Sequence, residues 1–173
     1  IRRPPRSTHC ISSAASDVYK RQNQYLTALQ SEILGKVQEV LFPNDGNGPS
    51  VVDVNAFNHV LWVLSDERKS EHSVQYIIDG LDWTEDSALE EYGRSFTELN
   101  PEEIESLVGV IAKEKWGGSW LSIMLTLIFE SLALDPVYKL NTNSVGWKWL
   151  GQFVGSPRPT DEISYDNIFK TID

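Results

Sequence analysis

Side chains that could support acid–base or metal chemistry are few in this sequence and lie far apart. Beyond residue 22 there are only two histidines, His59 and His72, and their spacing matches no compact metal motif. Each is interpreted as a hydrogen-bonded or solvated histidine. Residues 45–48 (DGNG) are typical of the start of a calcium loop, but the remaining ligand positions and the final glutamate of that motif are missing.

The sequence also lacks the common catalytic and phosphate-binding motifs. It contains no GxSxG, HExxH, GxGxxG or GxxxxGK[ST] pattern. Acidic residues recur at 82–86 and 102–105 and could act as general acids, but solvated helix faces commonly carry such runs. A helical enzyme that uses carboxylates or a metal, with Asp45 and Asp135 as its key residues, is therefore kept only as an alternative hypothesis.

Aromatic residues are the more informative feature, because six tryptophans are many for a chain of this length. Trp147 and Trp149 follow a helix break at Asp135-Pro136 and a run of turn-forming residues. Side chains two positions apart point in different directions in a strand and in a helix, so both rings cannot enter one core. We predict that one of them is an interface anchor, the role in which tryptophan is most enriched, and that at least one lies in the core.

The elements that position these residues are predicted to be helices. Apolar residues recur at helical spacing, and no alternating strand pattern occurs, over residues 24–41, 54–64, 70–91, 101–113 and 120–134. The sequence predicts one compact all-α domain of about five helices, with an irregular C-terminal arm from residue 151. Residues 120–134 are too short to span a membrane, which needs about 20 apolar residues, and are predicted to form a core helix enclosed by the others.

Local signals mark several helix ends. Gly93 suits the residue that follows a helix, and Asn100-Pro101 with Glu103 forms a capping-box start. We expect an irregularity near Gly80 and a short linker at residues 117–118.

Residues 1–22 differ from the rest of the chain. Residues 12–22 (SSAASDVYKRQ) look like the translation of a short-read sequencing adapter, and residues 1–8 resemble the flow-cell end of the same adapter. A secretory signal does not fit, because no apolar region follows the basic residues. We therefore place the domain at residues 23–173 and expect the native start, with any signal peptide or lipid anchor, to be missing.

Excluding this segment makes the chain more acidic. Residues 1–22 hold five of the fifteen basic residues and one of the twenty-five acidic ones, so the rest carries a formal charge of −14 instead of −10. This charge argues against nucleic-acid binding, because phosphate contacts need clustered Lys and Arg. The only cysteine, Cys10, also falls in this segment, so the domain has no disulfide, thiolate metal site or cysteine nucleophile.

Segments from residue 24 to residue 160 resemble a known family, most specifically near the C-terminus. Residues 135–138 (DPVY), Asn141 and residues 146–151 (GWKWLG) are similar to the signature of gluconate 2-dehydrogenase subunit 3. Residues 41–45, 92–103 and 155–160 resemble its other conserved segments in the same order. One departure is Lys139-Leu140, where the family usually has a Gly-Gly pair that permits positive φ and close backbone approach.

This resemblance implies an accessory subunit that is not catalytic by itself. Such subunits accompany a large FAD-dependent dehydrogenase of the glucose-methanol-choline type, often with a cytochrome c subunit, and commonly carry a twin-arginine export signal. It implies no cofactor in this chain, FAD and in some complexes haem c in the partners, and a periplasmic location. Arg2-Arg3 belong to the adapter-like segment and are not interpreted as that signal.

The same resemblance supplies the candidate binding residues, while leaving open a free-standing helical interaction module. The candidate partner-binding residues are those of the signature and of its proline-arginine close: Asp135, Pro136, Tyr138, Asn141, Gly146, Trp147, Trp149 and Arg158.

Overall fold

Six α-helices and three short 3-10 helices make up the part of the chain that the computed structural model describes, residues 25–152. No strand occurs within those residues, so the predicted all-α fold is confirmed. In chain order the elements are α2 (Ala28–Leu41), α3 (Ala56–Leu64), α4 (Glu71–Tyr92), η1 (Phe96–Glu98), α5 (Pro101–Ile111), α6 (Lys115–Ala133), η2 (Pro136–Tyr138), η3 (Thr142–Ser144) and α7 (Val145–Trp149).

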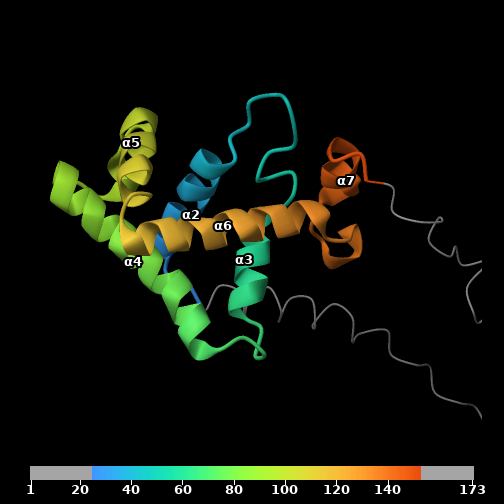
Figure 1. The fold of residues 1–173 in the computed structure, drawn as a ribbon, viewed down its shortest axis with the longest axis horizontal. Helices are drawn as coiled ribbons and strands as arrows, with labels where there is room; N and C mark the ends of the chain where they lie inside the picture. The colour runs from blue at the N-terminus through green and yellow to red at the C-terminus, as the bar shows by residue number, and fades with distance from the viewer. Residues whose placement is uncertain (1–24, 153–173) are drawn as a thin grey trace, which may run out of the picture.

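Helix α6 is the axis of the fold. It packs against α2, α3, α4 and α7, and it crosses the view of Figure 1 with α4 and α5 at one end and α7 at the other. The main core gathers buried side chains from α2 to α6, the largest of which are Ile33, Leu34, Leu81, Phe96, Leu107, Trp120 and Met124. A second, smaller core lies toward α7 and consists of Val51, Val54, Ala56, Ile128 and Leu132.

The helix ends follow their local signals. Asn100 accepts a hydrogen bond from the Glu103 backbone N–H while the Glu103 carboxylate accepts one from the Asn100 N–H, as the predicted capping box requires. Gly93 ends α4 at φ 64°, also as predicted. Helix α2 starts at Ala28 and not at residue 24, because Thr27 and Gln30 form a second capping box that sequence analysis missed.

Two expectations about glycines were wrong. Residues 117–118 lie inside α6 and do not form a linker; a Cβ on Gly117 would lie 2.0 Å from the Ile111 carbonyl oxygen. Helix α4 is continuous through Gly80, where a Cβ would lie 2.1 Å from Trp120 Nε1. Both glycines therefore serve close packing between elements and do not break a helix.

Helix α6 was predicted to be enclosed by the other helices, but one side of it is exposed. Its exposed stripe, spaced four and three residues apart, consists of Ser119, Ser122, Thr126, Phe129 and Ala133. The hydroxyls of Ser119, Ser122 and Thr126 donate to carbonyls four residues earlier, so they are left as hydrogen-bond acceptors only.

Candidate partner-binding surface

Residues 135–149, which we call the C-terminal clip, fold back on the end of α6 around Asn141. Asn141 is fully buried with φ 47°, in the left-handed region that asparagine tolerates better than most residues. Its Nδ2 donates to Leu134 O at 3.1 Å, its Oδ1 accepts from Gly146 N at 2.7 Å, and its backbone N–H donates to Val54 O at 3.1 Å. One residue, through its side chain and its backbone N–H, thus ties α6, α7 and the turn before α3 together.

Gly146 and Trp147 complete the contact with α6. A Cβ on Gly146 would lie 2.4 Å from Leu132 O, so only glycine lets α7 approach this closely. Trp147 Nε1 donates to Ala133 O at 2.7 Å. The last carbonyls of a helix have no partner within it, and here the clip supplies partners for two of them.

Trp149 connects the clip to the loop after α2. Its Nε1 donates to Asn47 O at 2.8 Å, and its ring packs edge-on against Phe42 with centroids 6.0 Å apart. Phe42 in turn packs edge-on against Phe129 of α6. Trp149 remains 46% exposed and Trp147 is half-buried, so neither ring lies in the core, where at least one had been expected.

The beginning of the clip carries the most exposed ring of the signature. Asp135 accepts a hydrogen bond from Val137 N at 2.8 Å and so starts η2 together with Pro136. Tyr138 is 58% exposed and stacks on Trp62 of α3, with centroids 5.9 Å apart and an interplanar angle of 17°. Trp62 was not among the predicted site residues. Its position off the apolar face of its helix was the available signal.

Lys139-Leu140 replaces the Gly-Gly pair of the family, and only the first of the two positions has the backbone conformation that favours glycine. Lys139 has φ 63°, whereas Leu140 is not among the positive-φ residues and buries its side chain to 3% exposure. The Lys139 carbonyl accepts from Asn55 Nδ2 at 2.9 Å. The departure from the family pattern thus leaves a strained lysine in the loop and adds a buried apolar anchor beside it.

The residues of the enzyme hypothesis do not converge on a site. His59 is buried and its Nε2 lies 2.8 Å from Glu130 Oε2, while His72 is exposed. Both carboxylate oxygens of Asp45 accept hydrogen bonds from Asn47, and these bonds, the one from the side-chain amide first, lower the pKa of Asp45. Within residues 25–152 no group of three His, Cys, Asp or Glu side chains is placed to hold a metal ion.

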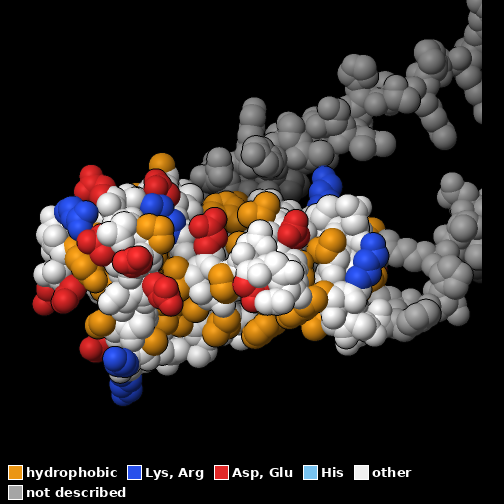
Figure 2. All heavy atoms as spheres, turned by 90° about the horizontal axis from the view of Figure 1, so that it is seen from above, with side chains coloured by type: hydrophobic (Ala, Val, Ile, Leu, Met, Phe, Trp, Pro, Cys, Tyr) orange, Lys and Arg blue, Asp and Glu red, His pale blue; other side chains and the backbone are white. Residues whose placement is uncertain are grey.

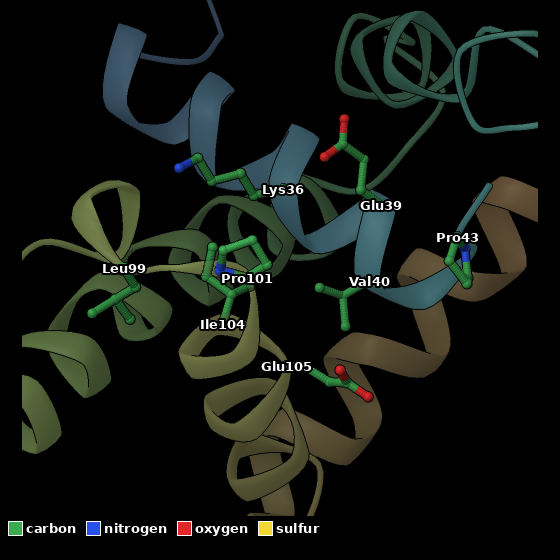
Figure 3. Close-up of a pocket in the computed structure, with 8 residues that line it drawn as sticks. All are labelled: Lys36, Glu39, Val40, Pro43, Leu99, Pro101, Ile104 and Glu105. Carbon is green, nitrogen blue, oxygen red and sulfur yellow. The ribbon is translucent and has the colours of Figure 1, made fainter. Parts of the chain in front are cut away.

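A cleft between α2 and α5 has the size of a ligand pocket, about 440 Å³, but no convergent polar groups. Glu39 and Glu105 point in different directions in Figure 3, and Lys36 Nζ donates to the Thr97 carbonyl at 2.6 Å. Its apolar lining includes Val40 and Ile104. This arrangement does not resemble a catalytic site.

The described part of the chain therefore defines a helical protein whose distinctive feature is a polar, aromatic clip at one end. The chain matches the family model of gluconate 2-dehydrogenase subunit 3 over residues 28–155 and belongs to that family, as the signature predicted. The family description makes it a subunit of a dehydrogenase complex. No curated protein and no solved structure gave a match.

Some of the predictions concern residues that the structure does not describe. Arg158 and the adapter-like residues 1–22 lie outside the described residues. Among residues 25–152, no helix has the length and apolar character needed to cross a membrane.

Proposed function

We propose that this chain is a non-catalytic accessory subunit that binds and stabilises a large FAD-dependent dehydrogenase of the glucose-methanol-choline type. The large subunit oxidises a sugar or sugar acid and carries the FAD, and a cytochrome c subunit carries haem c where one is present. The accessory subunit is exported with its partner by a twin-arginine signal and works on the periplasmic side of the membrane. Family membership supports the subunit role.

The observation that carries the proposal is the uneven distribution of exposed apolar side chains. Within the described residues eleven large apolar side chains are exposed, and seven lie on the clip or the segments beside it: Val52, Trp62, Phe129, Val137, Tyr138, Trp149 and Leu150. Contiguous exposed apolar surface, especially aromatic surface, marks protein interaction sites.

The charge distribution also favours the α7 end of the molecule as the partner-binding surface. In Figure 2 most of the visible acidic side chains lie over the α4–α5 half, together with several basic ones, whereas the charged groups visible around α7 are mainly basic. Interface cores are depleted of charge, and a strongly acidic surface keeps the remainder of a subunit in solvent.

Co-expression with the neighbouring gene for the large flavoprotein tests this function. The two chains are expected to co-purify, and the yield of flavin-loaded large subunit is expected to rise when the small chain is present. A small chain that stays monomeric and leaves the flavoprotein yield unchanged would refute the proposal.

A free-standing interaction module is the second candidate. The observation that favours it is Lys139-Leu140, because the replaced glycine pair alters the loop that leads to the exposed Tyr138. A stable complex with a protein unrelated to dehydrogenases, and none with the flavoprotein, would support this alternative.

A further inference from the structure

An exposed aromatic pair beside a hollow marks one face at the α7 end. Trp62 and Tyr138 stack on each other next to a hollow of about 390 Å³ between α3 and α6, which Trp62 and Ala133 help to line. Phe129 and Ala133 are one helical turn apart on the exposed stripe of α6 and extend this surface along the helix. We call Trp62, Phe129, Ala133 and Tyr138 the docking face.

Two aromatic side chains of the docking face have a polar group that can still form a hydrogen bond with a partner. Trp120, Trp147 and Trp149 each donate the indole N–H to a backbone carbonyl of this chain. Among residues 25–152, the indole N–H of Trp62, like those of Trp83 and Trp116, has no hydrogen-bond partner, and neither has the hydroxyl of Tyr138. Trp83 and Trp116 are half-buried among other rings, whereas Trp62 and Tyr138 are exposed. A buried indole or phenol normally finds a partner, so covering this pair favours a surface that supplies acceptors.

Stacking also prepares the pair for binding. Trp62 comes from α3 and Tyr138 from η2, and each ring holds the other in place at 40% and 58% exposure. Rings that are already ordered lose little conformational freedom when a partner covers them. Tryptophan and tyrosine are the residues most enriched among side chains that dominate binding energy.

The charged groups around the docking face indicate which kind of partner surface it would bind. The carboxylates that line the hollow are engaged, since Glu130 contacts His59 and Asp66 pairs with Arg68. Hydrogen bonds from Arg68 hold the pKa of Asp66 at about 2, so this pair stays charged at neutral pH.

Two lysines of the clip side remain available for a partner. Lys139 and Lys148 are exposed, and neither is in an ion pair within the described part of the chain. A partner surface with carboxylates around an apolar centre would complement them.

We propose that the docking face binds the large flavoprotein subunit, through an apolar patch on that subunit that is rimmed by carboxylates and presents acceptors to Trp62 and Tyr138. This assignment rests on the proposed function and specifies which surface performs it. The acidic α4–α5 end then remains in solvent.

The experiment measures how much flavoprotein co-purifies with variants of the full chain. Trp62→Ala combined with Tyr138→Ala is expected to weaken the complex by about 30-fold, the loss that defines a dominant interface residue. Leu89→Ala combined with Val110→Ala is the matched control, because both side chains are similarly exposed at the α4–α5 end. The control pair is expected to change the affinity less than about twofold.

A second variant separates binding from folding. Ala133→Gln adds bulk to the exposed face without removing any packing, and without a positive charge that a carboxylate-rimmed partner would attract. Its thermal unfolding is expected to match the wild type while its affinity falls by about tenfold or more. Light scattering of the isolated chain reports whether the face instead binds a second copy.

Each outcome has a defined meaning. A wild-type chain that does not co-purify with the flavoprotein refutes the proposed function itself. Co-purification that the face variants and the control variants leave equally intact overturns only the assignment of the face. A homodimer that Ala133→Gln dissociates, without loss of flavoprotein binding, also overturns it.

Discussion

Trp120 and Trp149 each pack against a glycine, but they belong to two regions that are stabilised by different interactions. Trp120 is fully buried against Gly80 in the main core, where α4 and α6 cross. Trp149 is 46% exposed against Gly48 at the edge of the small core. Continuous helices and apolar packing define the first region, whereas single hydrogen bonds to backbone groups define the second.

Backbone conformation separates the two regions as well. The non-glycine residues with positive φ among residues 25–152 all belong to the clip or its support: Asn55, Lys139, Asn141, Asn143 and Ser144. Each such residue costs on the order of 1 kcal/mol, and this strain persists only while the surrounding contacts hold it. We therefore infer that the clip opens independently of, and before, the main core.

The largest effect is expected at the crossing of α4 and α6. Gly80→Ala would place a Cβ 2.1 Å from Trp120 Nε1 and is expected to destabilise the whole domain by about 3 kcal/mol, measured by chemical unfolding. Gly35→Ala is the control, because a Cβ there meets nothing within 4 Å in the middle of α2. It should stabilise the domain by roughly 0.5–1 kcal/mol, and equal losses for both variants would contradict the packing argument.

A smaller and local effect is expected at the centre of the clip. Asn141→Ala leaves the Gly146 N–H and the Leu134 carbonyl without partners and is expected to cost about 2 kcal/mol. Hydrogen exchange should accelerate at the amides of residues 141–150 and stay slow in α4. The control is Thr142→Ala, an exposed position. Uniform acceleration throughout the domain would show that the two regions unfold together.

The tryptophans of α7 sharpen the comparison further. Trp147→Phe and Trp149→Phe each remove one indole hydrogen bond, at a cost of about 1 kcal/mol, with the larger loss at the less exposed Trp147. Complete removal by Trp147→Ala or Trp149→Ala is predicted to weaken assembly with the partner more than it weakens folding. Thermal unfolding of the isolated chain and co-purification distinguish the two, and equal losses would make both rings purely structural.

The smallest effect is expected from relieving strain. Lys139→Gly places the favoured residue at φ 63° and is expected to stabilise the clip by about 0.5 kcal/mol, the gain being partly offset by the freedom of glycine in the unfolded chain. Leu140→Gly is the contrasting control, since it removes a buried side chain and should destabilise by roughly 2 kcal/mol or more. Chemical unfolding of both variants, with opposite signs expected, checks the interpretation of the substituted pair.

Sequence was sufficient where the cause of the structure is local. The capping box of Asn100 and Glu103 and the end of α4 at Gly93 depend on neighbouring residues and were predicted. The start of α2 was placed too early, because the apolar spacing continues through Tyr25 and Leu26 before the Thr27 cap.

Prediction from the sequence failed where a structural feature depends on a residue far away in the chain. Nothing near Gly80 in the chain shows that Trp120 packs against it, and Trp62 became a candidate only when Tyr138 was seen to stack on it. The signature residues divided in the same manner. Their importance was predicted from family resemblance, but only the structure distinguishes Asn141, which holds the clip together, from Tyr138, which faces outward.

The hydrogen bond between Trp149 and Asn47 joins residues 102 positions apart, which gives the clip a place in the order of folding. The main core already joins distant residues, because α2 packs against α6, but all of its elements are complete by the end of α6. The small core and the clip join residues 42–56 to residues 128–149, so they also need the segment that follows α6. During synthesis Tyr138 can therefore stack on Trp62 only after α6 has been made, so a partner that recognises this pair would select subunits whose domain is already assembled.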